Sequence, residues 1–141
     1  MMTNDRPILI GLGCSTSADA DEVLALVQAC LVEANCQADQ IVALASHTRK
    51  AGSRALADAA DYFGLPLLFL DDEMVSPNIA STCESVAAAA GPLLLAKRKS
   101  RFATCAIAQC TPSFTQERLV QPGSANAAIA ASMSATSVAG P

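Results

Sequence analysis

The sequence predicts an α/β protein, a three-layer α/β/α sandwich around a mainly parallel five-stranded sheet that ends in an antiparallel hairpin. Short apolar runs alternate with longer stretches in which apolar residues recur at helical spacing, a pattern typical of βαβ units. The runs are apolar at successive positions, as expected of strands that are covered on both faces. The domain is expected to span residues 1–110, and the Ala- and Ser-rich residues 111–141 are expected to form a weakly structured tail.

The predicted elements follow from the apolar runs and their boundaries. Each expected strand is a short apolar run bounded by Gly, Pro or charged residues, and the runs cover residues 7–13, 40–46, 66–70, 93–96 and 102–108. The first helix is expected to begin after Ser17 or Asp19, both good N-cap residues, and the second to end at Gly64, a typical C-cap. The third helix covers residues 83–90. Only KRKSR separates the last two strands, so they should pair as an antiparallel hairpin at or beside one edge of the sheet.

Composition and charge argue against several classes of protein. The chain has 141 residues, of which 52 % are hydrophobic and 16 % charged, and its net charge is −4. This acidic balance, with no Trp and one Tyr, argues against nucleic-acid binding. No run of about 18 apolar residues indicates a membrane span, and the N-terminal run is too short for a signal peptide, so a cytoplasmic protein is expected. The six cysteines form no CxxC pair and there is one histidine, so neither a metal site nor a cofactor is predicted.

Basic residues concentrate in two short segments that follow strands. If the first four strands run parallel, their carboxyl ends share one edge of the sheet, where α/β proteins bind their ligands. Seven of the nine Lys and Arg residues then lie in or just beyond two loops at that edge: Arg49, Lys50, Arg54, Lys97, Arg98, Lys99 and Arg101. Such a local positive field on an acidic protein suits a polyanionic small ligand. The alternative is that KRKSR is an ordinary solvated hairpin tip.

Gly11 and Gly13 lie at the end of the first predicted strand. Because Thr16 stands where a third glycine would be needed, GLGCST is only the start of a dinucleotide-binding motif. The glycines are more simply explained by a backbone that approaches a ligand or a neighbouring element closely. Ser15 and Thr16 add hydroxyl groups, and the helix start that follows offers free N–H groups to an anion. These four residues are therefore candidates for ligand binding.

Two residues at the same edge are candidates for catalysis. Cys14 precedes a helix N-terminus, a position typical of reactive thiols, but no base is adjacent in sequence, which favours an inert thiol. His47 is the only histidine and follows the second strand, where both a functional and a structural role are open. Residues 71–73 offer carboxylates, although a charge cluster at a helix N-terminus explains them more simply. Ser81 and Glu84 have the spacing of a capping box at the start of the third helix.

Four stretches together resemble one known family. In order and spacing they are similar to the CobE/CbiG C-terminal domain family of cobalamin biosynthesis, which has a G-[IL]-G-C turn, a lysine after the second strand, an LG-[LI]-P-L segment, an E-S-V-A helix start and a K-R-K strand end. The stretches are GLGCSTSADADEVLALV, LASHTRKAGSRALADAADYFGLPLLFLDDE, ESVAAAAG and LLLAKRKSRFATCAIA. The resemblance covers roughly residues 7–109. Ser15 and Thr16 stand where many relatives carry Arg or Lys, and His47 stands where relatives often carry an apolar residue.

The resemblance implies a role in cobalamin synthesis. Fused to larger N-terminal regions, the domain is part of cobalt-precorrin-5A hydrolase, which opens a lactone and releases acetaldehyde. Standing alone, it resembles a protein of the aerobic pathway that has no clearly assigned reaction, and the length of this chain favours that form. The implied ligand is a precorrin or corrinoid, an anionic tetrapyrrole-derived macrocycle with acetate and propionate side chains. The family's residues carry over to Gly11, Gly13, Cys14, Lys50, Lys97, Arg98 and Lys99.

The sequence leaves three functions open. The leading hypothesis is a protein that binds a polycarboxylate precorrin or corrinoid at a basic cleft, with residues 97–99 pairing with its carboxylates and residues 49–50 assisting. The second is an enzyme of the same pathway, a lactone hydrolase or isomerase, with His47 as base and Cys14 or a bound water as nucleophile. The third is an interaction subunit that docks on a pathway methyltransferase or another enzyme of cobalamin synthesis.

Overall fold

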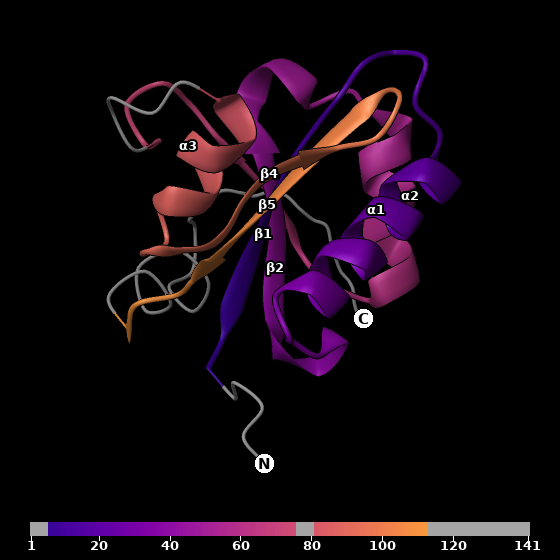
Figure 1. The fold of residues 1–141 in the computed structure, drawn as a ribbon. Helices are drawn as coiled ribbons and strands as arrows, with labels where there is room; N and C mark the ends of the chain where they lie inside the picture. Colours follow the sequence, from indigo (N-terminus) through magenta and orange to yellow (C-terminus); the bar gives the residue numbers. More distant parts are fainter. Residues whose placement is uncertain (1–5, 76–80, 113–141) are drawn as a thin grey trace.

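The computed structural model describes residues 6–75 and 81–112, which form a sheet with helices on both faces. The strands are β1 (Ile8–Cys14), β2 (Ile41–His47), β3 (Leu67–Leu70), β4 (Leu93–Lys99) and β5 (Ala103–Gln109). The helices are α1 (Ala20–Glu33), α2 (Arg54–Phe63) and α3 (Thr82–Ala88), with short 3-10 turns η1 (Ala38–Gln40) and η2 (Thr48–Lys50). Helices α1 and α2 lie on one side of the sheet and α3 on the other (Figure 1), which confirms the predicted α/β/α sandwich.

The strand order β3-β2-β1-β5-β4 places the hairpin at one side of the sheet. β1 pairs in parallel with β2, and β2 with β3, whereas β5 is antiparallel to both of its neighbours, β1 and β4. β4 therefore runs in the same direction as β1. As predicted, the carboxyl ends of β1, β2, β3 and β4 share one edge of the sheet, which we call the carboxyl edge.

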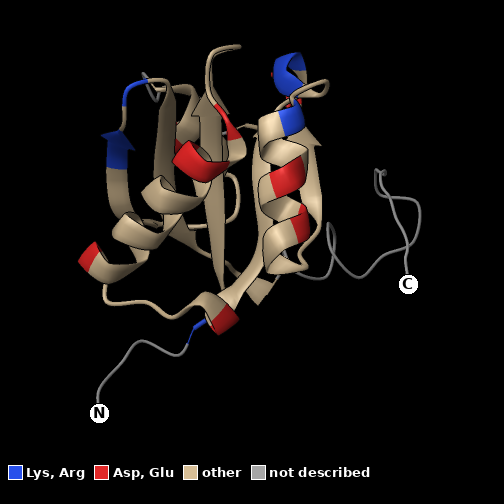
Figure 2. Cartoon of the chain, turned by 90° about the vertical axis from the view of Figure 1, so that its right-hand side faces the viewer, with Lys and Arg blue, Asp and Glu red and all other residues tan. Residues whose placement is uncertain are grey.

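The hairpin differs from the prediction in the position of its turn. β4 continues to Lys99, so Lys97, Arg98 and Lys99 belong to a strand, and the turn consists of residues 100–102. Figure 2 shows basic residues on the β4 arrow itself and on the turn beyond it. β4 is an edge strand, where charged side chains reach solvent and also discourage pairing with another chain, so charge does not end the strand. Arg98 and Lys99 pair with Cys105 and Thr104 of β5, whereas Lys97 lies where the register of the pair shifts.

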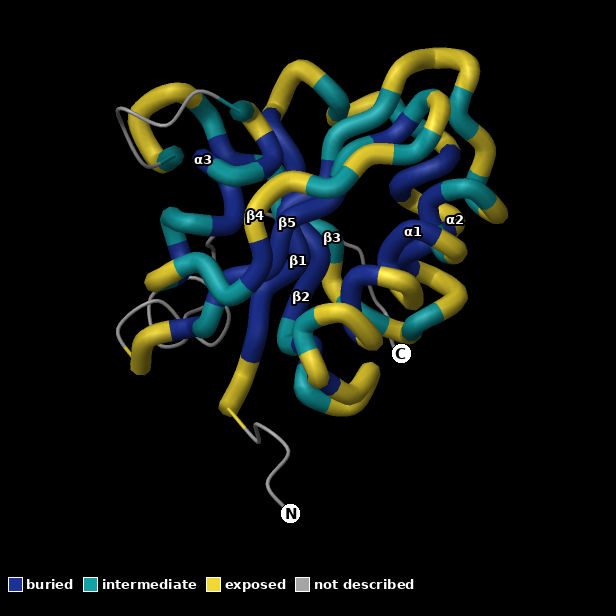
Figure 3. The backbone as a smooth tube through the Cα atoms, in the orientation of Figure 1, coloured by how far each residue is buried: buried dark blue, intermediate teal, exposed yellow. Residues whose placement is uncertain are grey.

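Side chains alternate between two apolar layers along the central strand. Ile8, Ile10 and Leu12 of β1 pack with α1 and α2, whereas Leu9 packs on the opposite side, where α3 lies. Figure 3 shows that most of β1 is buried between these two layers. Gly11 belongs to the α3 side as well. An ideal Cβ at Gly11 would lie 2.3 Å from the carbonyl oxygen of Cys83 in α3. The absence of a side chain at Gly11 is therefore what lets α3 sit against the sheet.

Two helix starts and one helix end follow local capping chemistry. Asp19 is the N-cap of α1, where its carboxylate accepts from the Glu22 N–H at 2.9 Å. Ser53 is the N-cap of α2, where its hydroxyl accepts from the Leu56 N–H at 3.3 Å. Gly64, with φ of 67°, ends α2 in the left-handed conformation and confirms the predicted C-cap.

The start of α3 shows where local spacing misled the sequence analysis. Ser81 is the N-cap, but it makes no side-chain capping bond, so the predicted capping box is wrong. Glu84 Oε2 instead accepts from the backbone N–H of Lys97 at 2.7 Å, because β4 lies beside α3 and offers an unpaired donor. Residues 71–73 form a turn directly after β3, whereas α3 begins at Thr82, so their assignment to a helix start is also wrong.

Two further expectations concern the ends of the chain and membranes. Of the predicted tail, only residues 111 and 112 are described, and residues 113–141 lie outside the described part of the chain. Among residues 6–75 and 81–112, no helix has the length and apolar character that crossing a membrane requires.

Candidate functional site

The carboxyl edge carries two separate groups of basic residues. One group, with Lys97, Lys99 and Arg101, lies at the end of β4 and in the turn that follows. The other, with Arg49 and Lys50, lies in η2 after β2. Figure 2 shows the two groups at the same end of the molecule but on opposite sides of the view. The sheet order explains this separation, because β1 and β5 lie between β2 and β4.

An open cavity of about 250 Å³ lies between the end of β1 and the tip of the hairpin. Its lining comes from residues 13–15 and 99–104, and we call this region the hairpin site. The backbone N–H of Ser15 donates to the carbonyl oxygen of Phe102 at 2.9 Å, which joins the two walls. The Arg101 guanidinium lies 5.2 Å from the centre of the Phe102 ring, a cation–π distance. The cavity therefore combines basic side chains and an aromatic ring with a wall of small residues.

Arg98 does not contribute to this cavity, although the sequence places it among the candidates. Its guanidinium forms hydrogen bonds of 2.6 to 3.0 Å with both carboxylate oxygens of Glu33, the last residue of α1. The hydrogen bond with Arg98 lowers the pKa of the Glu33 carboxyl, and the same bond raises the pKa of Arg98. The charge of Arg98 is thus already balanced by a carboxylate of the same chain.

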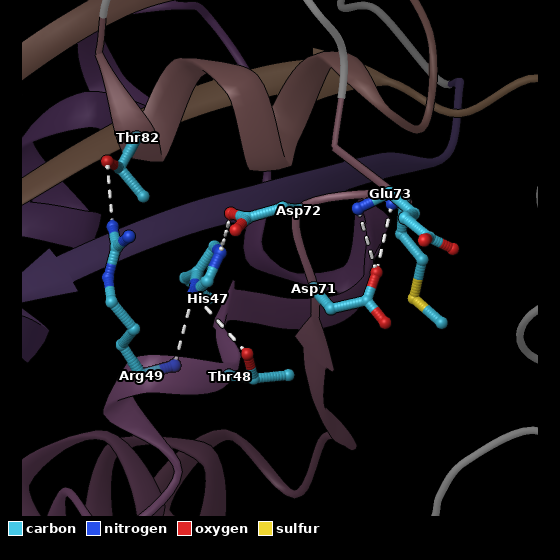
Figure 4. A network of polar contacts seen from close by, with 8 residues as sticks. His47, Thr48, Arg49, Asp71, Asp72, Glu73 and Thr82 are labelled. Atoms are coloured by element: carbon cyan, nitrogen blue, oxygen red, sulfur yellow. Dashed lines mark hydrogen bonds and ion pairs between the residues drawn. The ribbon is translucent and has the colours of Figure 1, made fainter.

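His47 forms the centre of the second group (Figure 4). Its Nδ1 accepts from the backbone N–H of Arg49 at 3.1 Å, so the ring proton is on Nε2, which donates to Asp72 Oδ1 at 2.6 Å. The His47 side chain is 7 % exposed and that of Asp72 is 85 % exposed. The Arg49 guanidinium donates to Thr82 Oγ1 at 3.4 Å. These residues, which we call the His47 site, connect β2 to the turn after β3 and to the start of α3.

His47 and Cys14 point to opposite faces of the sheet. The parallel register of β1 and β2 places His47 level with Gly13, and Cys14 is the next residue along β1. Successive strand residues alternate between faces, so His47 lies on the α3 side and Cys14 on the side of α1 and α2. Cys14 Sγ lies 3.4 Å from Ser53 Oγ, and Cys14 packs against the apolar layer on that side. No hydrogen bond joins His47 to Cys14 in the described part of the chain.

The structure brings some of the predicted residues together and separates others. Those that line the cavity of the hairpin site are Gly13, Cys14, Ser15 and Lys99. Those that lie outside its lining are Gly11 beneath α3, Thr16 in the turn after β1, Lys97 and Arg98 in β4, and His47, Arg49 and Lys50 at the end of β2.

Several side chains that contact the predicted residues come from distant parts of the chain and were not predicted from the sequence. Ser53 beside Cys14 is an N-cap residue, and its spacing before an apolar helix could have been recognised. Asp72 beside His47 could have been found only with the strand order, which brings the end of β3 next to the end of β2. Glu22 contacts the hairpin tip across a sequence separation of 80 residues, and no local pattern signals it.

Comparison with known proteins identifies relatives of the whole domain. The family model described as "Cobalamin synthesis G C-terminus" matches residues 8–108. The solved structure of CobE, "a protein from the cobalamin (vitamin B12) biosynthetic pathway", is similar with 26 % identity and a TM-score of 0.64, over 79 % of this chain and 95 % of that chain. None of the curated proteins compared matches the sequence.

Two further solved structures share the fold at lower identity. The cobalamin biosynthesis protein chiG from Agrobacterium tumefaciens str. C58 is 24 % identical with a TM-score of 0.62, over 74 % of this chain and 98 % of that chain. A putative cobalamin biosynthesis protein G homolog from Sulfolobus solfataricus is 23 % identical with a TM-score of 0.59, over 75 % of this chain and 37 % of that chain. At these identities the likeness shows the fold alone.

Proposed function

The chain belongs to the cobalamin synthesis G C-terminal family, and on that premise we propose that it binds an anionic, tetrapyrrole-derived intermediate of corrinoid synthesis at the hairpin site. The observation that carries the proposal is the cavity of about 250 Å³ bordered by Lys99 and Arg101. Within the described residues neither cation forms an ion pair, whereas Arg98, the residue before Lys99, pairs with Glu33. Two cations that no carboxylate of residues 6–75 and 81–112 neutralises are available to carboxylates of a ligand.

The size of the cavity limits how the ligand binds. Pockets that enclose a drug-sized ligand have volumes of about 300–1,000 Å³, and a tetrapyrrole macrocycle is larger than such a ligand. The hairpin site therefore receives one edge of the ring with its acetate or propionate groups, and most of the macrocycle stays outside. Phe102 offers an apolar surface at the rim, and the small residues 13–15 let a carboxylate approach the backbone.

The remaining predicted residues take different parts in this proposal. Arg49 and Lys50 lie at the same edge and add to the positive field without lining the cavity. Lys97 lies two residues before Lys99 on the exposed edge strand and contributes in the same way. Gly11 acts through packing, because α3 covers it.

Catalysis by His47 with Cys14 receives less support from the geometry. The two side chains lie on opposite faces of the sheet, and both ring nitrogens of His47 already take part in hydrogen bonds. Cys14 does line the hairpin cavity, so a reaction at a bound ligand would use its thiol with a base other than His47.

A titration with hydrogenobyrinic acid, followed by its visible spectrum, tests the proposal. We expect saturable binding at micromolar protein in low salt, with affinity that decreases as salt increases because the contacts are ionic. Replacing Lys99 and Arg101 with alanine should weaken binding by about tenfold or more, since charge-assisted hydrogen bonds are lost. Arg6→Ala, a control at the opposite edge of the sheet, should bind normally. The absence of a spectral change with the unmodified protein would refute the proposal.

A further inference from the structure

Glu22 of α1 contacts the tip of the hairpin through two hydrogen bonds to one oxygen. The Phe102 N–H donates to Glu22 Oε2 at 2.6 Å, and the Ser100 hydroxyl donates to the same atom. The carboxylate is partly buried where the first turn of α1 meets the turn of the hairpin. Its partners are 78 and 80 residues away in the sequence, so the contact exists only in the folded domain.

The tip is held from a second direction by the end of β1. The carbonyl oxygen of Phe102 accepts from the Ser15 N–H at 2.9 Å, while its own N–H is bound by Glu22. Both backbone polar groups of Phe102 are therefore used to attach the tip to other elements. Within the tip, the Ser100 N–H donates to the Ala103 carbonyl oxygen at 2.9 Å, which closes the turn. One wall of the hairpin cavity is thus fixed by the contacts of Glu22 and Ser15.

Glu22 fixes the hairpin tip without pairing with its basic side chains in the described part of the chain. It accepts from a hydroxyl and a backbone N–H, and it forms no ion pair with Lys99 or Arg101 in the described part of the chain. Glu33, at the other end of the same helix, does the reverse, because its carboxylate is paired with the guanidinium of Arg98. Two carboxylates of α1 therefore act differently on the same basic segment.

We infer that Glu22 is a positioning residue for ligand binding at the hairpin site, an inference that rests on the proposed function. By fixing Phe102 and Ser100, it keeps the neighbouring cations where a carboxylate of the ligand can meet both. A site that is ordered before binding loses less conformational freedom when the ligand arrives. A carboxylate that raises the affinity for an anion is unexpected from charge alone, since like charges repel. Charge repulsion predicts that removing Glu22 strengthens ligand binding, whereas positioning predicts that it weakens binding, so the two explanations can be distinguished.

The experiment compares Glu22→Ala with Glu33→Ala, two variants that remove the same charge from the same helix. If charge alone decides affinity, both should bind hydrogenobyrinic acid at least as tightly as the unmodified protein. If Glu22 positions the tip, Glu22→Ala should bind about tenfold more weakly, whereas Glu33→Ala binds no more weakly than the unmodified protein. Glu22→Gln keeps an acceptor but no charge, so it should recover part of the loss. Equal or tighter binding by Glu22→Ala overturns the inference.

Amide hydrogen exchange measures the attachment of the tip without any ligand. The Phe102 amide should exchange slowly in the unmodified protein and in Glu33→Ala, but much faster in Glu22→Ala, while amides of β1 and β5 stay protected in all three. Faster exchange throughout the domain would mean that Glu22→Ala unfolds, and Glu22→Gln then carries the test. If the unmodified protein binds no corrinoid, the proposed function fails, while unchanged exchange at Phe102 refutes the role of Glu22 separately.

Discussion

Replacing Gly11 with alanine should destabilise the domain strongly through the packing of α3. The new Cβ would lie 2.3 Å from the Cys83 carbonyl oxygen, 2.9 Å from the Ala87 Cβ and 3.0 Å from the Ala87 nitrogen. Two of these three atoms are backbone, so no side-chain rotation relieves the clash and α3 must move away from β1. Overpacking of a core costs about 1–3 kcal/mol, and a clash with helix backbone belongs at the upper end. For a domain of this size we expect the melting temperature to fall by roughly 10 °C.

Gly13→Ala is the matched control, two residues along the same strand and on the same face. Its Cβ would meet only the Thr104 hydroxyl oxygen at 2.7 Å, and that side chain can rotate. The expected cost is about 1 kcal/mol, the lower end of the same range. Since Gly13 lines the hairpin cavity, this variant should lose ligand affinity more than stability.

Thermal and denaturant unfolding, followed by circular dichroism, measures both variants against the unmodified protein. The reasoning predicts a large loss for Gly11→Ala and a small one for Gly13→Ala. If Gly11→Ala melts within a degree or two of the unmodified protein, α3 does not depend on the close approach. The glycine would then have to be explained by direct contact with a ligand, as the sequence alone permits.

Three further predictions concern titratable groups. Of the six cysteines only Cys14 is partly exposed, so N-ethylmaleimide should add once to the native protein and six times after denaturation, as measured by mass spectrometry. Burial raises the pKa of Cys110 to about 11, so stability should decline from about pH 8.5 upward, and less so in Cys110→Ala. Hydrogen bonding to Arg98 lowers the pKa of Glu33, so the stability from this pair should be present above about pH 4.3 and decrease as pH falls, a loss absent from Arg98→Ala.

The sequence contains enough information to predict the layers and the shared edge, because both depend on local patterns. Apolar runs such as residues 41–45 supply buried side chains to both faces of the sheet, and this continuous apolar character predicts a central strand. The hairpin can be predicted because the five residues between the last two apolar runs are too few for a crossover connection between parallel strands. The end of β4 is different, since Lys97 and Lys99 look like a turn by charge but lie on an edge strand that tolerates them.

The contents of the site depend on contacts that local patterns do not encode. Spacing suggests that Glu84 closes a capping box with Ser81, but the carboxylate binds the Lys97 N–H, which only the folded domain brings within reach. The partner of Arg98 could not be predicted from local spacing either, because Glu33 lies 65 residues earlier in the sequence. A count of basic residues at the edge therefore overestimates the charge available to a ligand.

The hydrogen bonds of His47 favour a structural role over a role as a catalytic base. A histidine that serves as a general base needs a free nitrogen directed at the reacting group. Here Nδ1 accepts from the Arg49 N–H, and the Nε2 proton is donated to the exposed carboxylate of Asp72. Both ring nitrogens are therefore engaged within the chain, and the imidazole links β2 to the turn after β3. The single histidine is thus better explained by the folding of the carboxyl edge than by a role as a general base.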